Sequence, residues 1–317
     1  MALCADYSCT PPTDPPTFRG ECGTVGSVKL RNACAMRSDA MPMVLVAFSL
    51  PLTGALAVLP QLPTSPNDMM QRAAAAVSRA TQENVKRQIV RIVVPDDERT
   101  YKVFGAVEIQ GTSAPEDLDP WPGGLKQQFP IALQLARNML KAVTGKADVS
   151  DQVLDAEDAC GLILAQGATP AEDAACVLFP GTDQMSSLAK VDAMAANRLL
   201  CLLNPQFKRL EDFSLWQKGA AKANFSDRGY ETTYAFEEFA VRGEDVKLCG
   251  EYGLGWRAFV VLDDTAEAVP LHEGALPERP AYTWLEATIN DRHPEPRWAR
   301  KMGEAEDKGL RFMRKDE

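Results

Sequence analysis

The chain has 317 residues, of which 45% are hydrophobic and 25% are charged, and its net charge is −10. This length and composition are typical of a globular protein with a sizeable core in one large domain or two small ones. The acidic balance argues against a general nucleic-acid binder, because such proteins carry a basic face.

Residues 1–60 are predicted to form a targeting leader. The leader begins with many turn-forming residues and then contains an apolar stretch at 42–58, about as long as the hydrophobic core of a signal sequence. The small-x-small sequence "ALA" that ends at Ala57 fits a cleavage site. Three interpretations stay open: a transfer signal removed after Ala57, a signal peptide that starts at Met41, or a retained anchor or buried segment.

Residues 61–292 are predicted to form a single α/β domain, which opens with a helix. In "TSPNDMMQRAAAAVSRATQENVKRQ", Ser65 suits the N-cap, Pro66 suits the first helical position, and the alanine run has high helix propensity. The β-branched run "QIVRIVVP" at 88–95 then predicts a buried strand. Residues 96–129 are interpreted as a solvated insertion, although "YKVFGAVEIQG" could supply one or two strands.

The next segments alternate helices with buried strands. "PIALQLARNMLKAVTG" predicts a helix that begins at Pro130 and ends at Gly145. Residues 149–166 begin like a helix and could end as a helix or a strand. The strand "ACVLF", the helix "TDQMSSLAKVDAMAAN" and the strand "RLLCLLNP" then indicate neighbouring or nearby parallel strands. The predicted fold class is therefore α/β, with a Rossmann-like parallel sheet flanked by helices.

After residue 206 the pattern predicts an antiparallel extension of about three strands. "RGYETTYAFEEFAV", "VKLCGEY" and "WRAFVVLDD" are the three segments, and the short glycine-bearing connections "RGED" and "GLG" favour hairpins. Residues 279–292 suggest a further helix. The tail at 293–317 is predicted to be an amphipathic C-terminal helix with four apolar contact residues, namely Trp298, Met302, Leu310 and Met313.

Few residues are arranged for chemistry. The motifs GxGxxG, GxSxG and HExxH do not occur, no CxxC is present, and we predict no catalytic residue, metal site or cofactor. In "FPGTDQ", Gly181 and Thr182 follow a predicted strand and open a predicted helix, where backbone N–H groups could bind an anion. The alternative is a plain turn in which Thr182 or Asp183 caps the helix. Cys176 and Cys201 are interpreted as buried packing residues rather than nucleophiles.

The order of several motifs resembles a known family. "LPTSPNDMMQRAAAAVSRA", "QIVRIVVP", "CVLFPGTDQMSSLAK", "CLLNPQF" and "YAFEEFAVRG" with "GEYGLGWRAFVV" resemble a plant, algal and cyanobacterial domain of unknown function, DUF1995. That domain is similar to the one in low-photosystem-II-accumulation factors and to the C-terminal extension of a chloroplast adenylate kinase. The resemblance implies a plastid protein with a Rossmann-like domain that acts in photosystem assembly or maintenance. It implies no catalytic residues, and residues 96–129 and the tail after 265 depart from it.

The function expected from these observations is that of a non-enzymatic plastid protein, in the stroma or at the thylakoid, that binds a protein partner. The partner would be a photosystem subunit or assembly intermediate, docked on the tail, with peripheral thylakoid association as a further expectation. The alternative is an enzyme that binds a nucleotide or phosphometabolite near Gly181, Thr182 and Asn204. Asn204 is included because it follows a strand at the edge where open α/β sheets bind ligands. A redox sensor is a third possibility, but no cysteine has an evident activating neighbour.

Overall fold

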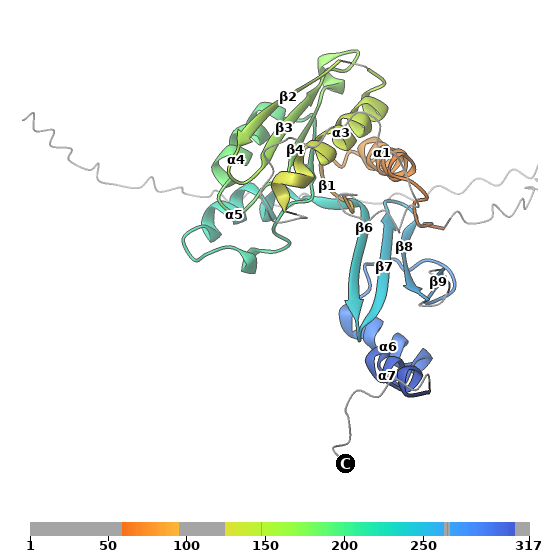
Figure 1. Cartoon of the computed structure of the whole chain (residues 1–317). Helices are drawn as coiled ribbons and strands as arrows, with labels where there is room; N and C mark the ends of the chain where they lie inside the picture. The colour runs from red at the N-terminus through yellow and green to blue at the C-terminus, as the bar shows by residue number, and fades with distance from the viewer. Residues whose placement is uncertain (1–58, 95–123, 147, 263–264, 266, 308–317) are drawn as a thin grey trace, which may run out of the picture. The chain divides into compact units, whose positions relative to one another are not determined.

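One mixed sheet organises the chain. The computed structural model describes residues 59–94, 124–146, 148–262, 265 and 267–307. Within these residues a nine-stranded sheet has the order β2-β3-β4-β5-β1-β6-β7-β8-β9 (Figure 1). The strands are β1 (Arg87–Arg91), β2 (Val149–Asp155), β3 (Cys160–Ala165), β4 (Ala174–Leu178), β5 (Leu199–Leu203), β6 (Glu231–Val241), β7 (Glu244–Glu251), β8 (Gly255–Val261) and β9 (Ala268–Pro270).

The centre of the sheet is parallel and both sides are antiparallel. Strands β4, β5, β1 and β6 run parallel to one another. Strands β2 and β3 are antiparallel at one side, and β6 to β9 form an antiparallel meander at the other. The predicted α/β class with a parallel core and an antiparallel extension is confirmed. The meander contains the three predicted strands and a short fourth, β9, that the sequence pattern did not indicate.

Helices pack on both faces of the sheet. Helices α1 and α3 pack together against one face, while α4 and α5 lie against the other (Figure 1). Helix α6 buries Leu285 and Ile289 against the antiparallel meander. The helices are α1 (Pro66–Gln82), α3 (Leu125–Thr144), α4 (Met185–Ala195), α5 (Lys218–Asn224), α6 (Tyr282–Arg292) and α7 (Arg297–Asp307), with the 3-10 turns η1 (Pro170–Glu172), η2 (Leu210–Asp212) and η3 (Ser226–Arg228).

The start of α1 and the end of α3 agree with the predictions from sequence, whereas the start of α3 does not. The Ser65 hydroxyl accepts the N–H of Asp68 at 3.0 Å, and Pro66 is the first residue of α1, as predicted. Helix α3 ends at Gly145 with a φ of 66°, also as predicted. The prediction that α3 begins at Pro130 is wrong, because the helix begins at Leu125. Pro130 lies inside the helix and has no N–H to donate, so one backbone hydrogen bond is lost there. This loss is outweighed by the apolar face that the longer helix packs against α1 and the sheet.

The ambiguous segment 149–166 forms a hairpin of two strands. Strands β2 and β3 pair in an antiparallel ladder, and β3 pairs on its other side with β4. The prediction that this segment begins as a helix is therefore wrong, and the prediction that it could end as a strand is confirmed. The reason is non-local, since Leu162 and Ile163 are both fully buried and belong to the cores on opposite faces of the sheet.

Strands β4 and β5 are adjacent and parallel. Cys176 lies directly opposite Cys201 in their register, and both belong to the core under α1 and α3. The prediction that these two strands are neighbours is confirmed, and so is the interpretation of the two cysteines as buried residues. Of the cysteines in the described ranges, Cys160 and Cys249 are buried as well.

Several predictions fall outside the described residues. These are the leader through residue 58, most of the insertion at 96–129, and Leu310 and Met313 of the tail. The predicted helices at 279–292 and in the tail are present as α6 and α7. In the described part of the chain, no helix combines the length and apolar character needed to cross a membrane.

Candidate functional site

The sequence-predicted ligand residues meet at the carboxyl edge of the parallel strands. Gly181 and Thr182 follow β4, and Asn204 follows the adjacent β5. The two segments are hydrogen-bonded, because the N–H of Phe179 donates to the Leu203 carbonyl at 2.9 Å. Beyond the strands, Phe179 and Asn204 both turn with left-handed φ values of 49° and 47°. The structure thus brings the candidate residues together at one edge.

The Gly181 amide is already bound by the protein itself. Its N–H donates to Oε1 of Gln184 at 2.8 Å, and Gln184 is 5% exposed. The Gln184 amide nitrogen donates in turn to Asp158 at 2.7 Å and to Asp155 at 3.2 Å. The turn after β4 is therefore closed by a side chain and flanked by carboxylates, which oppose a phosphate.

The capping alternative for this turn needs correction. Helix α4 begins at Met185 with Gln184 as its N-cap, so the prediction that Thr182 or Asp183 caps it is wrong. The physical reason is that Asp183 accepts the side-chain N–H of Gln217 at 2.6 Å, while the Thr182 carbonyl accepts the same group at 3.4 Å. This turn therefore joins α4 to the segment before α5 instead of capping the helix.

Asn204 acts as an extension of the sheet. Its Oδ1 accepts the N–H of Ile92 at 2.7 Å, and its Nδ2 donates to the Ile92 carbonyl at 2.9 Å. The side chain thus mimics a backbone partner for the residue that follows β1. Both polar groups of the Asn204 amide are engaged by the chain's own backbone, so the geometry indicates a structural role.

A cavity of about 700 Å³ opens beside Asn204 at the same edge. Three cationic side chains line it, from β1, from the segment after β5 and from the segment before α6: Arg91, Lys208 and Arg279. Arg91 donates to the carbonyls of Pro205 and Phe207 at 3.2 and 3.0 Å. Arg279 pairs with the carboxylate of Glu237 at 2.5 Å and lies over the ring of Phe239. The sequence analysis missed this cavity because its residues come from segments far apart along the chain.

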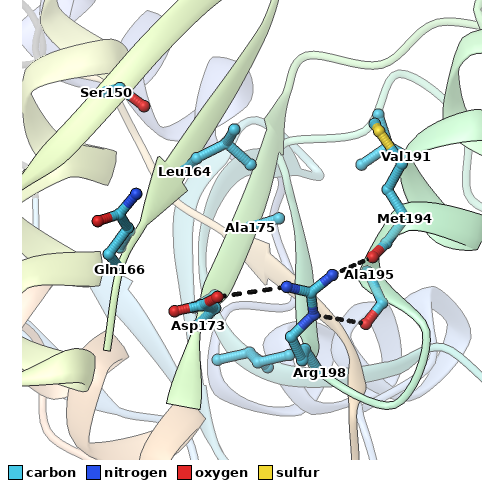
Figure 2. Close-up of a pocket in the computed structure, with 12 residues that line it drawn as sticks. Ser150, Leu164, Gln166, Asp173, Ala175, Val191, Met194, Ala195 and Arg198 are labelled. Carbon is cyan, nitrogen blue, oxygen red and sulfur yellow. Dashed lines mark hydrogen bonds and ion pairs between the residues drawn. The ribbon is translucent and has the colours of Figure 1, made fainter. Parts of the chain in front are cut away.

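A second cavity, of about 280 Å³, lies at the opposite edge, near the amino ends of β4 and β5. Its walls are mostly alkyl groups, including Leu164 of β3 and Met194 of α4. At its rim Arg198 donates to Asp173 at 3.2 Å and to the carbonyls of Met194 and Ala195 (Figure 2). The charged groups are thus paired with each other, and the remaining lining is mostly apolar, with Ser150 and Gln166 as uncharged polar side chains (Figure 2).

The four cysteines in the described ranges have thiols of low reactivity. Burial raises the pKa of Cys176 to about 12 and raises that of Cys201 well above its ordinary value. Burial likewise raises the pKa of Cys160 and Cys249 to about 12. Because the thiolate is the reactive form, these four thiols have little nucleophilic character at neutral pH. No three His, Cys, Asp or Glu side chains in the described ranges are grouped closely enough to hold a metal ion.

Helix α7 presents an apolar face. Trp298 is 66% exposed and Met302, one turn later, is 41% exposed. The opposite side of the helix is fixed to the β6–β7 hairpin, where Arg297 donates to the Gly243 carbonyl at 2.8 Å and Arg300 pairs with Glu244 at 2.6 Å. The structure thus places two of the four predicted docking residues together at the surface.

Comparisons with known proteins define the family. The model of the domain of unknown function DUF1995 matches residues 63–287, which include α1, the whole sheet and most of α6. No match was found among curated proteins or among solved structures. The match covers most of the chain and includes both candidate ligand segments, and it ends before α7. The chain therefore belongs to the DUF1995 family.

Proposed function

We propose that this protein is a non-enzymatic plastid protein that binds a protein partner in photosystem assembly or maintenance, or as an associated subunit. The setting, in the stroma or at the thylakoid, comes from the resemblance described above. The observation that carries the binding role is the fixed and exposed apolar face of α7.

The attachment of α7 makes this face suitable for docking. Besides the bonds of Arg297 and Arg300, the Arg242 guanidinium donates to the carbonyl of Pro294 at 2.8 Å, just before the helix begins. The helix is therefore held by its polar side. Trp298 and Met302 are four positions apart, so they lie on one face of the helix, as the anchors of a helix bound in a groove do. Tryptophan is enriched among the residues that dominate binding energy at interfaces.

The test is crosslinking with mass spectrometry in isolated plastids, comparing the native chain with Trp298→Ser/Met302→Ser. We expect the double variant to lose its crosslinked partner, because both apolar anchors become polar while the arginine contacts of α7 are kept. The matched control is Val153→Ser/Met194→Ser, which alters side chains that are 57% and 58% exposed elsewhere. Recovery of the same partner by the α7 variant would contradict the proposal.

The alternative function is the binding of a nucleotide or phosphometabolite, and the cavity at the carboxyl edge favours it, since three cationic side chains line it against two glutamates, Glu237 and Glu238. Lys208 is the informative position, since its side chain is exposed and lines that cavity. A thermal-shift screen with nucleotides and phosphates should give a stabilisation that Lys208→Gln weakens. No shift with any compound would argue against this alternative. Asn204→Ala is a poor probe because the variant should itself unfold more easily.

A further inference from the structure

The segment between η2 and α5 presents two large apolar side chains to solvent. Leu215 is 77% exposed and Trp216 is 92% exposed, the highest values among the large hydrophobic residues in the described part of the chain. Isolated exposed apolar residues are common, but an adjacent pair that includes a nearly fully exposed tryptophan is unusual. The sequence "FSLWQK" contained this signal, because an apolar pair interrupts a polar segment.

Leu215 and Trp216 lie in a turn that is held in place by contacts on both sides of the pair. We call this turn the 213–218 loop. Before the pair, Phe213 is buried, and its ring lies 4.9 Å from that of Phe207. After it, Gln217 accepts the Ser214 hydroxyl at 2.7 Å and donates to Asp183 at 2.6 Å. The loop is thus fixed to the body by the residues on both sides of the pair, which leaves Leu215 and Trp216 directed outward.

Basic residues outnumber acidic ones around the 213–218 loop: residues 208–222 contain four basic residues and two acidic ones, Glu211 and Asp212, which pair with Arg209, while Asp183 of the neighbouring turn accepts a hydrogen bond from Gln217. Lys208, Lys218 and Lys222 are exposed, and none of them forms an ion pair with a carboxylate in the described residues. Lys218 and Lys222 are one turn apart on α5, so they share a face. The whole chain carries a net charge of −10, so this local excess of positive charge opposes the general balance. An anionic surface is the complementary partner.

We propose that the 213–218 loop attaches the protein to an anionic lipid surface. Leu215 and Trp216 would enter the interface, where the amphipathic ring of tryptophan is favoured, and the three lysines would contact headgroups. A lipid surface fits better than helix-in-groove docking because two adjacent side chains at the tip of a turn form a wedge, whereas helix-in-groove docking requires anchors at helical spacing. This inference does not rest on the role of α7, which uses a different surface.

The first test is sedimentation of the full chain with vesicles of phosphatidylcholine and phosphatidylglycerol, compared with vesicles of phosphatidylcholine alone. We expect the native chain to bind the anionic vesicles more strongly than the neutral ones. Added salt should weaken this binding, and so should the double substitution Leu215→Ser/Trp216→Ser. Lys218→Gln/Lys222→Gln should weaken binding about fivefold for each lysine removed. Lys141→Gln is the matched control for an exposed lysine on α3, and Val153→Ser is the control for an apolar side chain on β2 that is 57% exposed. Both controls should bind like the native chain.

The second test is local and separates this loop from any other lipid-binding part of the chain. Vesicles that contain brominated lipids quench a tryptophan that enters the bilayer, so the native chain should lose more fluorescence than Trp216→Phe. Equal quenching of the two proteins would overturn the proposal. So would equal binding to anionic and neutral vesicles, or unchanged binding by the serine variant. Loss of a protein partner by that variant with vesicle binding intact would assign the loop to protein recognition instead.

Discussion

Replacing Asn204 tests whether the carboxyl edge is structural. The Asn204 side chain makes two hydrogen bonds to Ile92, at 2.7 and 2.9 Å, and Ile92 is 6% exposed. Asn204→Ala would leave a buried N–H and a buried carbonyl without these partners, at a cost of about 1 kcal/mol or more for each. The φ of 47° adds about 1 kcal/mol for alanine, since asparagine tolerates this conformation better. We therefore expect a loss of about 3 kcal/mol.

Two further variants separate the two contributions. Asn204→Gly removes the same hydrogen bonds but tolerates a positive φ, so its loss should be about 2 kcal/mol. Asn84 is the matched control, because its φ is 66° and it is exposed, and its side chain has no hydrogen bond to another described residue. Asn84→Ala should lose about 1 kcal/mol, which corresponds to backbone strain alone.

The assay is urea unfolding followed by both fluorescence and circular dichroism, whose agreement checks for a two-state transition. The free energies of unfolding should decrease in the order Asn84→Ala, Asn204→Gly, Asn204→Ala. If Asn204→Ala loses no more than Asn84→Ala, the two bonds to Ile92 contribute nothing measurable, and the structural interpretation of Asn204 is refuted. A ligand role for this residue would then regain support.

Two other predictions concern buried groups. Iodoacetamide should leave Cys176 and Cys201 unmodified in the folded protein at neutral pH, because burial raises the pKa of both thiols; peptide mass spectrometry checks this, and rapid labelling of either would contradict it. Asp192→Ala should lower the free energy of unfolding by about 3–5 kcal/mol, because Asp192 is 1% exposed and pairs with Arg87, which is itself 11% exposed. Arg228→Ala should cost about 1 kcal/mol or less, since that guanidinium is 46% exposed, and equal losses in urea unfolding would show that burial does not decide the cost.

The features that sequence predicted well are those that depend on neighbouring residues. The Ser65 cap and the glycine at 145 act within one turn of their helices, so their chemistry is visible locally. The runs before Pro180 and Pro205 are apolar throughout, because strands covered on both faces need no alternation. The parallel neighbours β4 and β5 could therefore be inferred without knowledge of tertiary contacts.

The features that sequence missed depend on contacts between distant segments. The role of Gln184 depends on Asp155 and Asp158, which the β2–β3 hairpin places beside it, so the sequence around Gln184 does not reveal this role. Likewise Asn204 suggested a ligand site from its place after a strand, but residue 92, which follows the adjacent strand β1, engages both the oxygen and the nitrogen of its side-chain amide. Segments that pair over such separations leave no local periodicity, which is also why residues 149–158 resembled a helix.

These contacts bear on where recognition takes place. At the carboxyl edge, Arg91 binds carbonyls of the segment after β5, Asn204 binds the segment after β1, and Gln184 closes the turn after β4. Polar groups that would face a ligand in another open α/β sheet are thus used here to join neighbouring loops. The three most exposed large apolar side chains in the described part of the chain lie instead on the 213–218 loop and on α7, namely Trp216, Leu215 and Trp298. If both proposals hold, the chain can bind a lipid surface and a protein partner at once, and a vesicle-bound protein should still capture its partner through Trp298.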